Sequence, residues 1–411
     1  MDEFAAVERA LRSAAPDDLL GVVTHVLMQR YGAERVELRL VDYGMRSLQA
    51  VENVPFTTRP VSVHGSPQGR AFGAQEPYVE RDADTGTATV HLPVTVRGDR
   101  TGVLSVGLPE ERYSPHLLPG MEHLCEALGH EILVAERDTD LYVLARRAAR
   151  LTLAAEMQWQ LLPGRACARR EFALGAHLEP AYAIFGDNYD WSASAADLTL
   201  TVTNGMGEGI EAALLSNLAV NALRNARRAG LDLAGQAALA DQAVYAHYRG
   251  RAYVSVLLLR FDLSTGEVEA VDAGSPRAWR LRDGSVEPLA FEAQLPLGMF
   301  EETVYEPERF TVRPGDRLLF GSDGVYDAAS PLGEKYGDRA LARALNATRL
   351  LPPAQVPGAV LRELAEYHGE SPLDDDALVV CLDWTGRDSG GAAELPADTG
   401  ADGGSPETVA D

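Results

Sequence analysis

The stretch LTLTVTNGMGEGIEAALL, residues 199–216, determines how the second half of this chain is interpreted. Its alternating apolar residues predict a strand, and the apolar spacing after Gly209 predicts a helix. The glycines between them allow a sharp turn, of a kind that brings a strand end close to a phosphate or a metal ion. At the lead position of this turn, where a metal site would more naturally have a carboxylate, the sequence has Asn204.

Composition limits the class of protein. A chain of 411 residues is too long for one ordinary core, so two domains are expected. The net charge of −24 argues against nucleic acid as a partner. No apolar run approaches the roughly 20 residues that cross a bilayer, and the acidic N-terminus is unlike a signal peptide. We therefore expect a protein of the cytoplasm that binds no membrane. Its three scattered cysteines fit a reducing compartment, with Cys125 and Cys381 packed in cores.

The N-terminal part of the chain mixes helical and strand patterns. Apolar residues at helical spacing over 4–31 predict two amphipathic helices, and the alternation over 35–43 predicts a strand. Residues 90–108 read as a hairpin, and 117–133 return to helical spacing. The pattern indicates a compact α+β domain over residues 1–134.

Residues 135–165 are expected to connect this domain to the next one. Neither glycine nor proline occurs between Ile132 and Leu162. Apolar residues alternate spacings of three and four, as in a short coiled-coil seam: Leu141, Leu144, Ala148, Leu151 and Ala155. The favoured interpretation is a connecting coiled-coil helix that forms a homodimer. The alternative is a surface helix that packs on its own domain.

Residues 166–385 form the second predicted domain. Strands are expected in EFALGAHLEP, DLTLTVT, YVSVLLLRFD, EVEAVDAG, AWRLRDG, RLLFGSDG and ALVVCLDW. Helices are expected over 208–229, 233–248, 336–349 and 353–368. Hairpin-linked strands with paired helices indicate two packed antiparallel sheets with helices outside. The acidic tail, residues 386–411, has no apolar period and is expected to be disordered.

Oxygen-bearing side chains recur where the predicted strands end. They are Asp187, Asn204, Asp323 and the run Asp374, Asp375 and Asp376. Carboxylates on adjacent strand ends repel one another unless a cation lies between them. A cluster of oxygen ligands without His or Cys selects Mg²⁺ or Mn²⁺. Two such ions about 4 Å apart can clamp a phosphoryl group for attack by water. The cluster therefore indicates phosphoryl chemistry.

Six motifs in fixed order resemble the SpoIIE-like branch of the PPM (type 2C, metal-dependent) serine/threonine protein phosphatases. They are AAEMQWQLLP, FGDNYD, TNGMGEGIEAALL, VDAGSPRAWRLRDG, LLFGSDGVYDA and DDDALVV. Residues 15–134 resemble a GAF domain, chiefly through SVHGSPQGRAFGAQEPYVE and LPVTVRGDRTGVLSV.

The resemblance implies an α-β-β-α sandwich of two antiparallel sheets and a site for two Mn²⁺ or Mg²⁺ ions. Asp187 and Asp323 match metal ligands directly, and the Gly205 carbonyl oxygen matches another. Asp374 aligns with the ligand of the family's D-D-x-T motif, and Asp375 is the alternative. Catalysis would act through these metals and a metal-bound water. The implied partners are a phosphorylated regulatory protein, such as an anti-sigma-factor antagonist, and an unknown small-molecule ligand of the GAF domain.

Asn204 is the main departure, because it falls on the family's bridging aspartate. The loss of one negative charge beside two dications costs on the order of several kcal/mol at an effective dielectric of ~20. One interpretation is a phosphatase that binds one of its two metal ions weakly. The other is a pseudophosphatase that binds or scaffolds a phosphoprotein. A third is that deamidation of Asn204-Gly205 supplies the missing acid.

Overall fold

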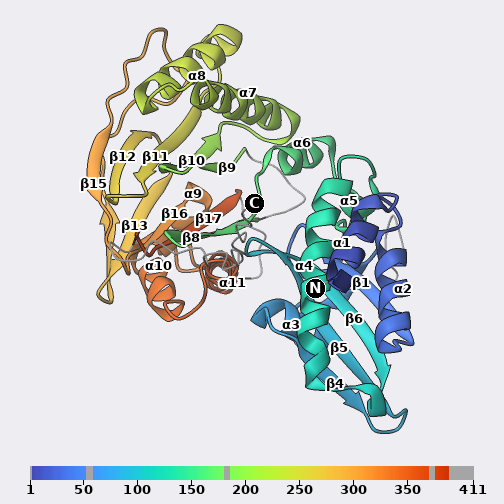
Figure 1. Ribbon diagram of the computed structural model, residues 1–411. Coiled ribbons are helices and arrows are strands. Elements are labelled where there is room, and N and C mark those ends of the chain that lie inside the picture. The colour runs from blue at the N-terminus through green and yellow to red at the C-terminus, as the bar shows by residue number, and fades with distance from the viewer. Residues whose placement is uncertain (1, 52–58, 180–185, 370–374, 388–411) are drawn as a thin grey trace, which may run out of the picture.

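The computed structural model describes residues 2–51, 59–179, 186–369 and 375–387. The chain forms two bodies of mixed helix and sheet, the N-terminal one in blue to cyan and the C-terminal one in green to red (Figure 1). All strand pairs recorded in the sheets of both bodies are antiparallel.

The N-terminal body is a six-stranded sheet in the order β3-β2-β1-β6-β5-β4. Its elements are α1 (Asp2–Ser13), α2 (Leu19–Tyr31), β1 (Arg35–Val41), β2 (Ser47–Ala50), β3 (Val61–Ser62), α3 (Pro67–Ala74), β4 (Tyr78–Asp82), β5 (Thr87–Val96), β6 (Asp99–Pro109), the short 3₁₀ turns η1 (Glu110–Arg112) and η2 (Pro115–Leu117), and α4 (Leu118–Ala135). The two predicted N-terminal helices, the hairpin and the helix after it are all present.

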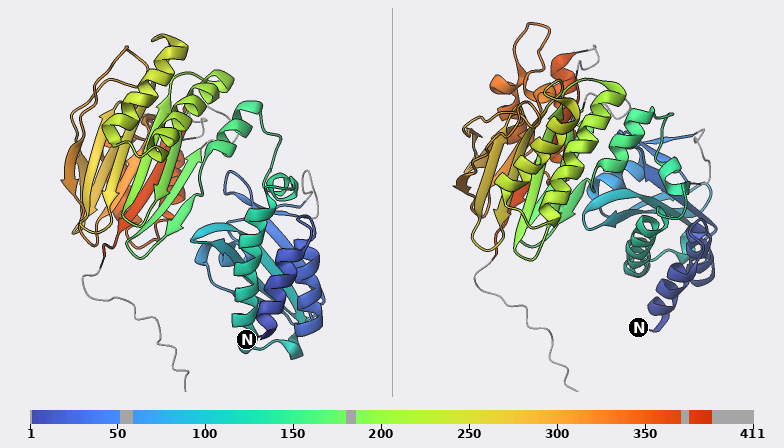
Figure 2. Two further views of the ribbon diagram at one scale, coloured as in Figure 1. Left: turned by 45° about the horizontal axis from the view of Figure 1, so that its top comes forward. Right: turned by 90° about the horizontal axis from the view of Figure 1, so that it is seen from above.

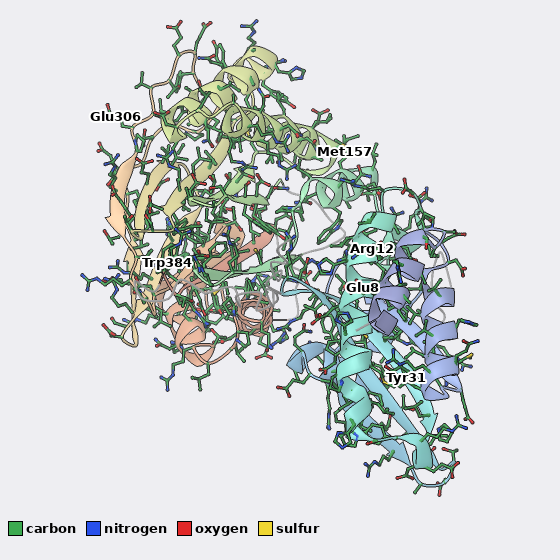
Figure 3. All side chains as sticks on the ribbon, in the orientation of Figure 1. Glu8, Arg12, Tyr31, Met157, Glu306 and Trp384 are labelled. Atoms are coloured by element: carbon green, nitrogen blue, oxygen red, sulfur yellow. The ribbon has the colours of Figure 1, made fainter. Side chains whose placement is uncertain are left out.

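Helices α1, α2 and α4 share one core with a face of this sheet, since Leu11, Leu27, Leu104 and Leu128 belong to the same buried cluster. Polar contacts join α1 to α4 at the surface, and Figure 3 labels the two α1 side chains that make them. Glu8 lies 3.0 Å from His123, and Arg12 lies 3.7 Å from Glu131. Exposed pairs of this kind contribute under about 1 kcal/mol, so the shared apolar core holds the helices on the sheet.

The C-terminal body has four layers. Its elements are β7 (Ala166–Ala168), β8 (Phe172–Glu179), β9 (Asn188–Ala193), β10 (Asp197–Gly205), α7 (Gly209–Arg228), α8 (Leu233–Tyr248), β11 (Val254–Asp262), β12 (Glu267–Ala273), β13 (Arg277–Arg282), β14 (Ser285–Leu289), β15 (Glu308–Thr311), β16 (Arg317–Gly321), α9 (Asp323–Tyr326), α10 (Tyr336–Ala347), α11 (Val356–His368) and β17 (Ala377–Trp384).

Two sheets face each other inside this body. One has the order β15-β12-β11-β10-β9 and the other β14-β13-β16-β17-β8-β7. Helices α7 and α8 cover the first sheet, and α10 and α11 cover the second (Figures 1 and 2). Leu200 and Leu259 from one sheet meet Phe320 and Val380 from the other in a single buried core. The observed arrangement is the predicted α-β-β-α sandwich.

The expected continuous helix over 135–165 is wrong. The chain instead forms two short helices, α5 (Leu141–Ala145) and α6 (Leu153–Leu161), separated by non-helical residues. The apolar positions of the seam divide between the two bodies. Leu141 packs against the N-terminal core, whereas Leu151 and Ala155 pack in one cluster with Ala213 of α7. Periodicity identified these three as packed positions, but it did not reveal that their neighbours lie in different domains, and Ala148 of the predicted seam is exposed.

All three cysteines are free and buried. Cys125 lies in the N-terminal core, and Cys167 and Cys381 lie in C-terminal clusters. Burial raises the pKa of each thiol above its ordinary value. Core packing was the expected role of Cys125 and Cys381.

Within the described ranges, no helix is both long enough and apolar enough to span a bilayer. Most of the predicted tail, from 388 onward, lies outside those ranges.

Replacement of Arg317 by Ala is expected to lower the free energy of unfolding by about 3 kcal/mol. This nearly buried guanidinium forms two bonds with Asp383, at 2.6 and 2.7 Å, and donates to the Thr348 and Leu351 carbonyl oxygens. Denaturant unfolding measures the loss. In the matched control Arg309→Ala, a guanidinium that is 66% exposed loses its ion pairs with acidic side chains, and the cost should stay below about 1 kcal/mol. Equal losses in the two variants would contradict this account.

Candidate metal centre

Polar side chains from both sheets converge at one end of the sandwich. Asp187 directly precedes β9, and Asn204 is the residue before the last one of β10. Asp323 follows β16 and begins α9, while Asp375 and Asp376 directly precede β17. Hydrogen bonds link these segments, which are separated by up to 189 residues in the chain. Three of the predicted metal ligands, Asp187, Asn204 and Asp323, therefore belong to connected strand ends.

Asp187 and Asp376 form the buried part of the cluster. The Asp187 amide donates to Asp376 Oδ2 at 3.2 Å, and both side chains are almost fully buried. Asp187 Oδ2 is buried without a hydrogen-bond partner among the described residues. Burial, followed by the negative charge of Asp376, raises the pKa of Asp187 well above its usual range. A cation would relieve both the desolvation and the repulsion.

Asn204 and Asp323 form the second link. The Asn204 side-chain amide donates to Asp323 Oδ1 at 2.5 Å, and so joins β10 of one sheet to α9 beside the other. Burial raises the pKa of Asp323, and hydrogen bonds, including the one from Asn204, oppose that rise. A carboxylate at position 204 would instead repel Asp323. The amide therefore stabilises this contact in the absence of a cation.

Two glycines allow the strand ends to approach each other. Gly186 has a φ of +109°, and a Cβ added to it would lie 2.4 Å from the Gly205 carbonyl oxygen. The Gly205 amide donates to the Gly186 carbonyl oxygen at 3.1 Å, and Ser216 Oγ of α7 donates to the same oxygen at 2.7 Å. Any side chain at Gly186 would push the Asp187 turn away from β10. The glycines therefore fix the position of Asp187 relative to Asn204.

The donors have the chemistry of a hard-cation site. They are carboxylate, amide and carbonyl oxygens, which suit Mg²⁺ or Mn²⁺, and the unpartnered Asp187 Oδ2 is a ready acceptor for such an ion. In the part of the chain that the structure describes, no three His, Cys, Asp or Glu side chains gather closely enough to enclose a metal. Asp374, the remaining carboxylate that the sequence assigned, lies outside the described residues. The described residues thus fit the ion in type and supply part of its ligand set.

Asp375 and Asp376 make different contacts beside the site. Asp375 Oδ1 accepts a bond from the Asp376 amide at 2.8 Å, so one oxygen of this alternative ligand is used by its own loop. Asp376, which belongs to the predicted acidic run but was not assigned as a ligand, is the acid that contacts the Asp187 turn. Its position immediately before the buried strand β17 was the available signal. The Gln158 side chain of α6 is a second addition, because it donates to the Asp187 carbonyl oxygen.

Asn204→Asp should be less stable than the wild type in EDTA, by about 2 kcal/mol, because it replaces a hydrogen bond with two facing carboxylates. Added Mn²⁺ should raise its melting temperature more than that of the wild type, since one more negative charge would then face the ion. Thermal unfolding with EDTA and with Mn²⁺ measures both effects. Asn221→Asp, on the exposed face of α7, is the control and should change neither value. Identical melting of Asn204→Asp and wild type under both conditions would contradict the prediction.

Comparisons with known proteins agree with the motifs. Residues 194–385 match the family described as Stage II sporulation protein E (SpoIIE). The phosphoserine phosphatase RsbP of Bacillus subtilis is 30% identical over 77 residues, and this match spans 19% of each protein.

Solved structures that resemble the chain include three with related descriptions. The SiaA-PP2C domain of Pseudomonas aeruginosa is 23% identical, with a TM-score of 0.48, over 56% of this chain and 94% of that one. The RsbU and RsbW domains of Rv1364c from Mycobacterium tuberculosis are 20% identical, with a TM-score of 0.46, over 53% and 62%. The phosphatase domain and a regulatory-domain fragment of Bacillus subtilis SpoIIE are 14% identical, with a TM-score of 0.47, over 93% and 95%. Over residues 194–385 the chain is therefore similar to the SpoIIE family, in agreement with the resemblance of its six ordered motifs to the SpoIIE-like branch of the PPM phosphatases.

Proposed function

We propose that this protein is a metal-dependent phosphatase that hydrolyses phosphoserine or phosphothreonine on a regulatory protein. The observation that carries the proposal is the convergence of acidic strand ends: the Asp187 turn bonds to Asp376, and Asp323 bonds to Asn204. Acidic groups that are buried together repel one another, a cation between them relieves this repulsion, and the donor set suits Mn²⁺ or Mg²⁺. Among the relatives, RsbP is described as a phosphoserine phosphatase.

The proposed ligands are Asp187, Asp323 and Asp374, with the Gly205 carbonyl oxygen, the Asn204 amide oxygen after a side-chain flip, and Asp375 as the alternative to Asp374. A pair of bound divalent ions would activate a water molecule and neutralise the phosphoryl oxygens. The chain itself would hold the carboxylates apart on two rigid sheets, so that the ions need little rearrangement. The glycine contact between Gly186 and Gly205 would keep Asp187 in place.

Arg277 is a candidate to position the substrate. It begins β13 and lies 4.0 Å from the centre of the Tyr326 ring, which belongs to the same short helix α9 as Asp323. Tyr326 in turn donates its hydroxyl to the Ser275 carbonyl oxygen at 2.6 Å. Stacking fixes the planar guanidinium at the edge of the acidic cluster, where it would bind a phosphoryl oxygen of the protein substrate.

The N-terminal domain is proposed to act as a GAF-like regulator. Contacts between the bodies support this proposal: the Ala168 amide of β7 donates to the Arg97 carbonyl oxygen at 2.9 Å, and Arg46 pairs with Glu179 at 3.0 Å. The Gln158 bond to Asp187 places α6, which follows that domain, against the metal centre. The GAF ligand, the anti-sigma-factor antagonist as substrate, the homodimer and the cytoplasmic location remain predictions.

A pseudophosphatase that binds or scaffolds a phosphoprotein is the second candidate. The Asn204–Asp323 hydrogen bond favours it, because this contact closes part of the site without a metal ion. The two candidates differ in one observable. A phosphatase with a weakened ion regains turnover when Mn²⁺ is in excess, whereas a pseudophosphatase of wild-type sequence does not.

Release of phosphate from a phosphoserine peptide at millimolar Mn²⁺ tests the proposal. Wild type should turn over, Asp187→Asn and Asp323→Asn should each lose at least about a hundredfold, and Asn204→Asp should work at lower Mn²⁺. Asp327→Asn is the matched control, since this acid lies one turn beyond Asp323 and pairs with Lys335 at the surface. It should stay within about twofold of wild type. Turnover by Asn204→Asp but not by wild type would establish the pseudophosphatase, and none from either would refute the catalytic proposal.

A further inference from the structure

A cavity of about 260 Å³ lies between the two bodies, away from the metal centre. Phe72 of α3 and Arg100 of β6 line it from the N-terminal side. Arg165, His177 of β8 and Arg362 of α11 line it from the C-terminal side. None of these residues belongs to the metal centre, so the cavity is a separate site.

The charge of this cavity is opposite to that of the whole chain. Three arginines line it, and Asp99 is the one acidic side chain among its described lining residues; the arginines are Arg100, Arg165 and Arg362. The complete sequence has a net charge of −24. A basic hollow in such an acidic protein attracts small anions.

Arg100 is buried without adequate compensation. Only 8% of the residue is exposed, and its Nε has no hydrogen-bond partner among the described residues. Burial lowers the pKa of Arg100 to about 10, and the neighbouring Asp99 only partly opposes this. Asp99 Oδ2 also accepts a bond from the Arg165 amide at 3.1 Å, so its charge is shared. A buried guanidinium in this state lowers stability unless an anion reaches it.

Arg165 presents a second guanidinium to the same cavity. Its Nη2 donates to the Tyr43 carbonyl oxygen at 2.5 Å, and its planar group lies 4.9 Å from the centre of the Trp159 ring. These contacts fix its orientation, yet Nη1 is buried without a partner in the described part of the chain. Two positioned guanidinium groups, one from each body, therefore have N–H donors to spare at one cavity.

We propose that this cavity binds a small anion carrying a carboxylate or a phosphate group, held between the domains by Arg100 and Arg165. Both oxyanions match the fork of N–H donors on a guanidinium. The cavity volume of about 260 Å³ lies just below the range of typical ligand pockets, which begins at about 300 Å³. The cavity therefore suits a small metabolite. Because the two arginines belong to different bodies, the anion stabilises their docked arrangement. This proposal does not depend on the proposed phosphatase activity.

Calorimetric titration of the full chain with sodium phosphate and, separately, with sodium malonate tests the site. Both titrations are done in EDTA, so that the metal centre cannot contribute, and at an ionic strength kept constant with NaCl. Saturable binding of phosphate, of malonate or of both supports the proposal and identifies the group recognised. Arg100→Met should then weaken binding at least tenfold, while Arg9→Met, on exposed α1, should change it less than twofold. No saturable binding of either anion, or unchanged binding by Arg100→Met, would overturn it.

Melting of the same variants separates binding from a structural role. Without anion, Arg100→Met should melt at or above the wild-type temperature, because an incompletely paired buried charge has been removed. With the binding anion, wild type should gain stability and Arg100→Met should not. Arg362→Gln gives a second readout at an exposed lining residue, with unchanged melting in the absence of anion and binding at least threefold weaker. Equal gains in stability in wild type and both variants would refute the site.

Discussion

Repulsion between buried acids at the ends of two packed sheets is the constraint on which the C-terminal domain depends. The apolar core between the sheets fixes where β10, β16 and β17 end, and these ends carry the polar groups of the site. The raised pKa values of Asp187 and Asp323 express the cost of this arrangement. Such a cost persists in a folded domain when a ligand or cation offsets it, so the acids indicate function better than they indicate stability.

Much of this architecture could be predicted from local patterns. The strands with alternating apolar residues and all four long helices of the C-terminal domain occur close to their expected ranges, because burial on one face imposes a period on the sequence. The polar strand β9 was missed, since its residues Asn188–Ala193 carry a weak apolar alternation. The connecting segment was wrong for a different reason. Leu141 packs on the N-terminal body and Ala155 on the C-terminal one, and no pattern in one sequence shows which domain such a position faces.

The residues of the site, too, could be predicted only in part from the sequence. Asp187, Asn204 and Asp323 could be selected because each follows or ends a recognisable strand, and the structure connects their segments. Asp376 could not be distinguished from its two acidic neighbours, because three consecutive aspartates carry no local signal for which of them will be buried. The two buried arginines between the domains had no sequence signal at all. They stand out only in the structure, where Arg100 Nε and Arg165 Nη1 have no hydrogen-bond partner among the described residues.

The burial of Cys125, Cys167 and Cys381 has a practical consequence. A thiol reacts as the thiolate, and in all three residues burial both blocks access and disfavours that form. The native cysteines are therefore expected to react little with maleimides or with thiol-directed spin labels. A single cysteine introduced on each body would report the separation of the domains, with no need to remove the native ones first.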